Sequence, residues 1–211
     1  MAETPENSRT RLLAATVDLV RANGYTATRV EEICAAAGVT KGSFFHHFES
    51  KEDLAIAAAG FWNERASRLF AHAPYLEKRN AIDRLLGYVA YRRELLEGDI
   101  WEWSCFAGTT IQETHETFPA IRDACARSIG SHLFMLRALI DDALRETAVP
   151  GLDSASLAIH IQAVVQGAFV MAKASQDRQS AADALGHLYR YVELLFSQST
   201  RKKPPKKKRP R

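Results

Sequence analysis

The chain has 211 residues, of which 46% are hydrophobic and 25% charged, the proportions of an ordinary globular protein long enough to bury a full core. Its net charge of +3 is unevenly distributed: the final segment, RKKPPKKKRPR, holds eight of the 28 Lys and Arg and no acid, which leaves 20 basic against 25 acidic side chains (−5) in residues 1–200. A generally basic surface is therefore excluded as a reason to expect nucleic-acid binding, and the absence of any run of 18 apolar residues predicts that no segment spans a membrane.

The first predicted helix covers residues 8–23. Leu12, Thr16 and Val20 recur at helical spacing along one side, which is therefore expected to be buried. The helix is expected to end at Gly24, because glycine is common directly after the last helical residue.

A second helix is predicted over residues 28–37. Thr28 and Glu31 have the spacing of a capping box, in which the two side chains satisfy amide groups that the first turn leaves unpaired. Gly38 is expected to end this helix because it can adopt the left-handed backbone conformation.

A third helix is predicted to begin after Thr40, whose hydroxyl can cap it. Phe44 and Phe48 share its apolar side, and the opposite side carries Lys41, Gly42, Ser43, His46 and His47. Such a helix is about 12 Å long at ~1.5 Å per residue, and the DNA major groove is roughly 12 Å wide. Two short helices joined by a tight glycine turn predict a helix-turn-helix over residues 29–48.

The rest of the chain predicts six more helices and no strand. Their ranges are about 50–72, 80–97, 101–116, 119–147, 153–176 and 180–197. The chain is therefore expected to be all-α with nine helices. We divide it into a DNA-binding domain (1–51), an effector-binding and dimerisation domain (52–198) and a disordered basic tail (199–211).

The segments GVTKGSFFHHFESKEDL and RTRLLAATVDLVRANGYTATRVEEICAAA resemble the TetR family of transcriptional regulators. The resemblance is dense over about the first 55 residues and rests on helix pattern alone beyond them. It implies a nine-helix TetR-like fold, with a three-helix DNA-binding head and a larger helical domain for ligand binding and dimerisation. It also implies a cytoplasmic, homodimeric regulator of transcription.

The resemblance places the DNA contacts on the helix-turn-helix. Lys41 and Gly42 are expected at base edges, where an ammonium donates to guanine and glycine permits a close approach. The set expected at DNA is Thr28, Arg29, Thr40, Lys41, Gly42, Ser43, Phe45, His46, His47 and Lys51. Two positions depart from the family's usual pattern: Phe45 replaces a tyrosine, and Glu31 replaces a basic residue, for which Arg29 can substitute.

The last two predicted helices are candidates for a dimer interface. Residues 157–172, LAIHIQAVVQGAFVMA, are apolar on nearly all sides, and the last helix repeats apolar residues as in the seam of a helix bundle. The residues expected at the interface are Val164, Gly167, Ala168, Met171, Leu185, Leu188, Val192 and Leu195. A monomer core explains the same pattern, but the resemblance favours a four-helix interface with two helices from each subunit.

Aromatic side chains are concentrated in the middle of the chain. Large aromatic residues commonly fill cores, but together with a few polar groups they can also line a ligand pocket. The expected pocket residues are Phe61, Trp62, Tyr88, Tyr91, Trp101, Trp103, Cys105, Phe106, Phe134 and Gln166, with Gln112, His115 and His132 as further polar candidates. The resemblance implies a small inducer, which we expect to be apolar or aromatic.

No enzymatic chemistry is recognisable in the sequence. The three cysteines, Cys34, Cys105 and Cys125, match no metal-ligand spacing and are expected to be reduced thiols. Cys105 beside the aromatic residues is compatible with a redox or electrophile sensor, although a small buried hydrophobic residue is the favoured interpretation. Neither a metal nor a cofactor is expected, and the chain is not expected to be an enzyme.

The predicted function is a homodimeric repressor that binds a palindromic operator and is released by a small apolar or aromatic ligand. Two-fold symmetry predicts half-sites about 34–36 Å apart, or a multiple-turn variant of that spacing. The basic tail is expected either to add salt-sensitive, sequence-independent DNA affinity or simply to keep the terminus soluble. The alternative function is a DNA-compacting protein that needs no ligand.

Overall fold

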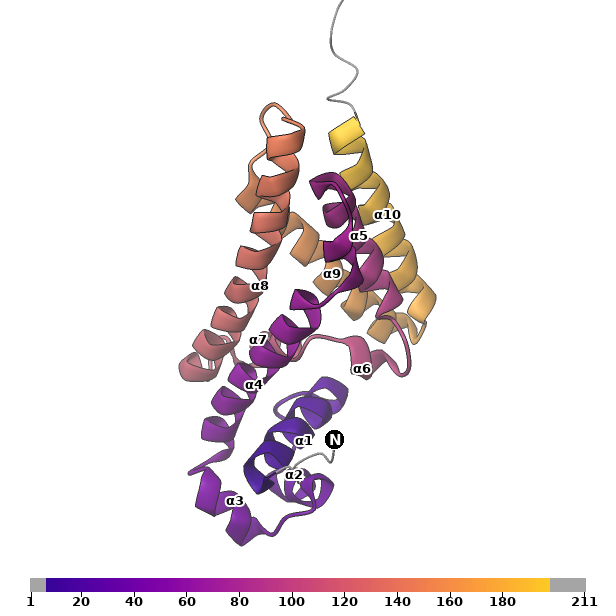
Figure 1. The fold of residues 1–211 in the computed structure, drawn as a ribbon. Coiled ribbons are helices and arrows are strands. Elements are labelled where there is room, and N and C mark those ends of the chain that lie inside the picture. Colours follow the sequence, from indigo (N-terminus) through magenta and orange to yellow (C-terminus); the bar gives the residue numbers. More distant parts are fainter. Residues whose placement is uncertain (1–6, 198–211) are drawn as a thin grey trace, which may run out of the picture.

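The computed structural model describes residues 7–197, and these residues form helices and no strand (Figure 1). The all-α class is therefore confirmed. The described residues form ten α-helices and one 3₁₀ helix: α1 (Ser8–Asn23), α2 (Val30–Ala37), α3 (Lys41–His47), α4 (Lys51–Ala71), η1 (Pro74–Glu77), α5 (Ala81–Glu94), α6 (Ile100–Trp103), α7 (Phe106–Thr114), α8 (Pro119–Glu146), α9 (Ser154–Ser175) and α10 (Arg178–Ser197). The predicted basic tail lies outside the described residues.

The predicted count of nine α-helices is wrong by one, because the helix expected over residues 101–116 is divided into α6 and α7. Ser104 and Cys105 have extended backbones, with ψ angles of 157° and 121°, so that α6 ends before them and α7 begins after them. The carbonyl of Ser104 accepts a hydrogen bond of 2.8 Å from Nε of Arg21, a residue of α1. A side chain from the first helix thus holds the break in place.

The second helix begins later than predicted. The amide of Arg29, the residue before α2, donates to the carboxylate of Glu32 at 2.8 Å. The predicted capping box of Thr28 and Glu31 is therefore wrong. Thr28 is buried, and its hydroxyl donates to the carbonyl of Gly24 at 2.7 Å, which ties the start of the second helix to the end of the first.

The N-terminal part of the molecule, which we call the head, consists of α1, α2, α3 and the first half of α4 (Figure 1). Its buried apolar residues include Leu12, Val17, Val20, Ile33, Phe44, Phe48, Leu54 and Ala58. The same hydrophobic cluster contains Phe106 from α7 and Ile121 from α8. The head is therefore packed directly onto the remainder of the chain, the body, and the boundary set after residue 51 stays a prediction.

The body has a second hydrophobic cluster, formed mainly by α5, α8, α9 and α10. Its fully buried residues include Leu85, Tyr88, Leu136, Ile140, Ile161, Val165 and Val192. α9 alone among the helices of residues 7–197 is long and apolar enough, by length and composition, to cross a membrane. Here it packs against α8 and α10.

Replacing Phe44 with Ala is expected to lower the free energy of unfolding by about 3–5 kcal/mol, because the ring is fully buried and packs against Phe48. Phe45→Ala is the matched control: this neighbouring ring is 56% exposed but packs edge-on against Phe44, so its loss should cost about 0.5–1.5 kcal/mol. Urea denaturation followed by circular dichroism measures both. Equal losses would contradict the orientation of α3.

Candidate DNA-binding surface and effector cavity

The orientation of α3 is fixed by a cap and by buried rings. The hydroxyl of Thr40 accepts a hydrogen bond of 3.1 Å from the amide of Ser43, as the sequence predicted. Phe44 and Phe48 are buried in the head cluster. The opposite side of α3 is consequently turned to solvent, where Lys41, Gly42, Phe45 and His46 are exposed and Ser43 is half-buried.

Lys41 forms an ion pair on this open side. Its Nζ lies 2.7 Å from Oε1 of Glu31, and both side chains remain largely exposed. The hydrogen bond between them lowers the pKa of Glu31 and raises the pKa of Lys41. An ammonium has three donor hydrogens, so Lys41 can still donate to a base or a phosphate while Glu31 is bound.

Arg29 and Thr40 are exposed beside α3, but three other predicted DNA contacts are engaged within the protein. Thr28 is buried. His47 is half-buried and shares a hydrogen bond of 2.6 Å with the hydroxyl of Ser8. Lys51 is half-buried, with Nζ 4.3 Å from the centroid of the Tyr25 ring, and burial lowers its pKa. The structure does not bring these three to the open polar side of α3.

A cavity of about 440 Å³ lies in the body between α4, α5, α8 and α9. Five of the ten predicted pocket residues line it: Trp62, Trp103, Cys105, Phe134 and Gln166. The structure does not bring the other five to its wall: Phe61, Tyr88, Tyr91, Trp101 and Phe106. Most of these fill cores instead, as Tyr88 and Phe106 show by being fully buried. Of the further polar candidates, His132 lines the cavity and Gln112 and His115 do not.

Sequence reasoning missed the arginines of the cavity. Arg21, Arg65 and Arg92 all line it, together with one acid, Glu102. The guanidinium of Arg92 lies 5.3 Å from the ring centroid of Phe70 and 5.5 Å from that of Phe169. An arginine in a helix with an otherwise ordinary amphipathic pattern gives no local sign that it points inward.

Several buried polar atoms in the cavity wall have no hydrogen-bond partner among residues 7–197. They are Nε1 of Trp103, Oε1 of Gln162 and Nε2 of Gln166. His132, by contrast, shares a hydrogen bond of 2.7 Å with the hydroxyl of Tyr88. Burial, reinforced by the charge of Arg92, lowers the pKa of His132 to about 3, so its imidazole is neutral at physiological pH.

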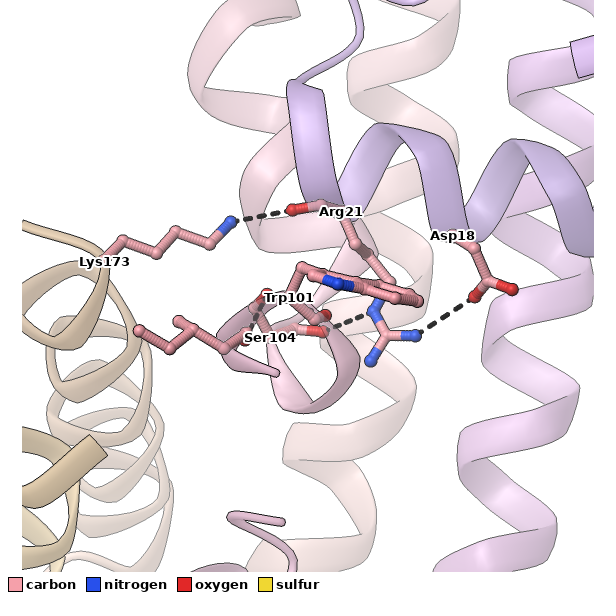
Figure 2. Close-up of polar contacts among 6 residues, drawn as sticks. Asp18, Arg21, Trp101, Ser104 and Lys173 are labelled. Atoms are coloured by element: carbon pink, nitrogen blue, oxygen red, sulfur yellow. Dashed lines mark hydrogen bonds and ion pairs between the residues drawn. The ribbon is translucent and has the colours of Figure 1, made fainter. Parts of the chain in front are cut away.

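Arg21 lies in the cavity wall and also joins the head to the body. Figure 2 shows its contacts with Asp18, Ser104 and Lys173. The Arg21 side chain is almost wholly buried, donates to the Ser104 carbonyl and lies 3.4 Å from Asp18. The guanidinium also lies 4.9 Å from the ring centroid of Trp62. The backbone carbonyl of Arg21 accepts a hydrogen bond of 3.0 Å from Nζ of Lys173, in α9. One residue of α1 therefore contacts α4, α6 and α9 as well as the cavity.

A second junction joins α7 to the loop between α1 and α2. The carboxylate of Glu113 accepts hydrogen bonds from the amides of Tyr25, at 3.0 Å, and Thr26, at 2.8 Å. A Cβ atom added to Gly24 would lie only 2.4 Å from this carboxylate, and the φ angle of Gly24 is +89°. Glycine is thus required here by both the backbone conformation and the close approach of Glu113.

Half of the predicted dimer interface lies inside the monomer. The residues buried in the body cluster are Ala168, Leu185, Leu188 and Val192. Val164 and Leu195 are half-buried, whereas Gly167 and Met171 are exposed. The other exposed large apolar residues of the same two helices, which sequence reasoning missed, are Ile159, Val170, Tyr191 and Leu194. The regular seam of α10 faces α9 and α5 of its own chain.

No group of three or more His, Cys, Asp or Glu side chains that could hold a metal ion occurs in the part of the chain that the structure describes. Cys34 and Cys125 are buried, and Cys105 is half-buried at the cavity wall.

Two family descriptions match this chain. Residues 12–58 match "Bacterial regulatory proteins, tetR family", and residues 81–188, just over half of the chain, match "Tetracyclin repressor-like, C-terminal domain". Among curated relatives, the transcriptional regulator AcuR of Cereibacter sphaeroides is 36% identical over 102 residues, which is 48% of this chain and 47% of AcuR. The repressor NemR of Escherichia coli is 32% identical over 89 residues, which is 40% of this chain and 43% of NemR. The match thus spans less than half of these relatives.

Solved structures share the fold over most of the chain. A TetR transcriptional regulator from Chloroflexus aurantiacus has a TM-score of 0.77 and 28% identity, covering 88% of this chain and 94% of that one. The reduced form of Escherichia coli NemR has a TM-score of 0.73 and 23% identity, covering 90% and 97%. At 23% identity, the similarity to the NemR structure shows a shared fold and nothing further.

Arg21→Met is expected to lower the free energy of unfolding by about 1–3 kcal/mol, because it removes the donor from the buried Ser104 carbonyl while keeping most of the side-chain volume. Asp18→Asn is the matched control. It removes the charge of the half-exposed partner but keeps an amide oxygen that can accept from the guanidinium, so it should cost less than Arg21→Met. Chemical denaturation measures both variants, and an Arg21 variant as stable as the wild type would contradict the junction.

Proposed function

The chain belongs to the TetR family of bacterial regulatory proteins, and we propose that it is a homodimeric repressor released from a palindromic operator by a small ligand. Members of the family are DNA-binding transcriptional regulators. The observation that carries the finer proposal is that Arg21 lines the cavity and also bonds to Ser104 at the junction between head and body. A ligand in the cavity therefore acts on a residue of α1, against which the reading helix is packed.

The exposed side of α3 supports the DNA-binding part of the proposal. Lys41, Gly42 and Ser43 begin the helix and are not covered by the body. In helix-turn-helix proteins the first residues of the second helix reach base edges in the major groove. We assign base contacts to Lys41 and Gly42, and phosphate contacts to Arg29, Thr40 and His46, which lie around them. His47 must leave Ser8, and Lys51 must leave the Tyr25 ring, before either can contact DNA.

Exposed apolar side chains on α9 and α10 support the dimer. Ile159 and Met171, both on α9, are each 59% exposed, and Leu194 on α10 is 55% exposed. Gly167 lies between the two α9 residues, and a Cβ atom added there would meet nothing within 4 Å. An open glycine flanked by apolar residues permits the close approach of a helix from a second copy. We place the two-fold interface on this exposed side of α9 and α10.

The junction at Arg21 gives ligand binding a way to change DNA affinity. A ligand that alters the position of Arg21, α6 or Lys173 changes how the head is held against the body. Allosteric coupling of about 1–3 kcal/mol weakens operator affinity roughly 5- to 150-fold. A DNA-compacting protein without a ligand needs neither the cavity nor its connection to the head. Footprinting separates the two functions, since a discrete protected palindrome supports the repressor and uniform coating supports compaction.

Lys41→Ala is expected to weaken binding to the operator, selected from random DNA with the wild-type protein, by about 5- to 150-fold, because a base contact contributes about 1–3 kcal/mol of discrimination. The dimer should be unaffected, since Lys41 is far in sequence from α9 and α10 and lies on the open side of α3. Gel-shift titration with specific and random duplexes measures the loss.

Glu31→Gln is the control for Lys41→Ala, because it breaks the same ion pair and keeps the ammonium. It should bind the operator at least as tightly as the wild type. If both variants lose affinity equally, the ion pair matters to the fold of the head, and the assignment of Lys41 to a base contact is wrong.

Gly167→Leu is expected to convert the dimer to a monomer, because the new side chain enters the space that we assign to the second copy. The monomer itself should tolerate it, since that space is empty within one chain. Gly130→Leu on α8 is the matched control, because it is also exposed, helical and free of neighbours within 4 Å. Sedimentation velocity measures the masses; a Gly167 variant that stays dimeric would exclude this interface.

A further inference from the structure

We infer that the effector is a small organic acid, with an apolar or aromatic body in the cavity and a carboxylate held by Arg92. The inference rests on the proposed function, because it names the ligand of the same cavity. It also narrows the sequence-based expectation of an apolar or aromatic inducer, which took no account of charge.

The first support is the charge of the cavity wall, where three arginines face one acid. The acid, Glu102, is already engaged: its carboxylate accepts a hydrogen bond of 2.7 Å from the amide of Asp99 at the start of α6. Arg21 is also engaged, by Ser104 and Asp18. The remaining positive charges in the wall have no comparable partner, so the cavity favours an anion.

Arg92 is the best placed of the arginines to bind that anion. Arg65 is exposed, whereas Arg92 is half-buried and held between the rings of Phe70 and Phe169. Within residues 7–197, the guanidinium of Arg92 forms neither a hydrogen bond nor an ion pair, and its contacts are with the two rings. A partly buried cation without an anion is costly, and a planar guanidinium is well suited to bind a carboxylate through two parallel hydrogen bonds.

A buried donor near Arg92 also lacks an acceptor. Nε1 of Trp103 has no hydrogen-bond partner in the described part of the chain. The Trp103 ring packs 5.5 Å from that of Phe169, the same ring against which Arg92 lies. A carboxylate accepts about four hydrogen bonds, enough to satisfy both Trp103 and Arg92. The unpaired amide atoms of Gln162 and Gln166 do not distinguish ligands, because rotation of each amide offers either its oxygen or its nitrogen.

The rest of the wall suits an apolar body. Trp62, Leu69, Phe70, Ile129, Met135 and Phe169 surround the space. His132, also in the wall, is neutral and adds no further charge. The cavity volume of about 440 Å³ lies within the range of small-molecule sites. An amphiphilic acid satisfies both parts of the wall, whereas a neutral hydrocarbon leaves Arg92 and the Trp103 donor unpaired.

The test compares acids with their neutral and cationic analogues on the full chain. The probes are benzoate, cinnamate and octanoate, each with its primary amide and its primary amine. Isothermal titration calorimetry and tryptophan fluorescence measure binding. At least one acid should bind about tenfold or more tightly than its amide, and its amine should bind least, because a hydrogen bond to a charged group is worth about 1.5–3 kcal/mol.

Two variants locate the charged group. Arg92→Met should weaken binding of the acid about tenfold or more and leave binding of its amide unchanged. Arg93→Met is the matched control, since Arg93 is the next residue of α5 but is exposed and lies outside the cavity wall. Amides that bind as tightly as acids, acids whose affinity is the same in the Arg92 variant, or a series in which no acid binds would each overturn the inference.

Operator release is measured separately, by gel shift with the same probes. Acids that bind through Arg92 but do not release the operator would support the ligand class and contradict the proposed repressor function. Release by a neutral compound that is unaffected by Arg92→Met would support the function and contradict the ligand class. The two failures are therefore distinguishable.

Discussion

A buried arginine holds the DNA-binding head in one position against the body. Only 3% of Arg21 is exposed, so its charge has been moved out of water and must be compensated inside the protein. The Ser104 carbonyl, the carboxylate of Asp18 and the face of Trp62 supply that compensation. Each partner comes from a different part of the junction, and the charge is satisfied only when α1, α4 and α6 keep their relative positions. This requirement explains why α6 and α7 are separated at Ser104.

Apolar packing also fixes the position of the head against the body. Phe106 and Ile121 of the body lie in the hydrophobic cluster of the head, and the Glu113 carboxylate binds two amides of the loop before α2. Protein interiors are close-packed, so a shift of α7 or α8 cannot be absorbed at this contact and must displace part of the head. Arg21 lies in both the junction and the cavity wall. The cavity and the head are thus connected through a few well-defined contacts.

The parts of the site that the sequence predicted are those set by neighbouring residues. The cap at Thr40, the buried side of α3 with Phe44 and Phe48, and the end of α1 at Gly24 all follow from signals within a few positions. Predictions from neighbouring residues were wrong where a residue makes a different contact in the folded chain. Thr28 has the spacing of a cap, but its hydroxyl bonds to Gly24 instead. The apolar repeat of α10 has the pattern of a dimer seam, but periodicity shows only which residues share a side, and here that side meets α9 and α5 of the same chain.

The sequence by itself determined the all-α class, the helix-turn-helix and the exposed polar side of α3, because helix periodicity, caps and glycine ends are encoded within one or two turns of chain. It also determined that aromatic residues are concentrated in the body. Only the tertiary structure decided which of them line the cavity, that arginines line it with them, and that α6 and α7 are separate helices. These features depend on contacts such as that between Arg21 and Ser104, which are 83 residues apart. No local sequence pattern specifies which distant side chain will donate a hydrogen bond to a given carbonyl.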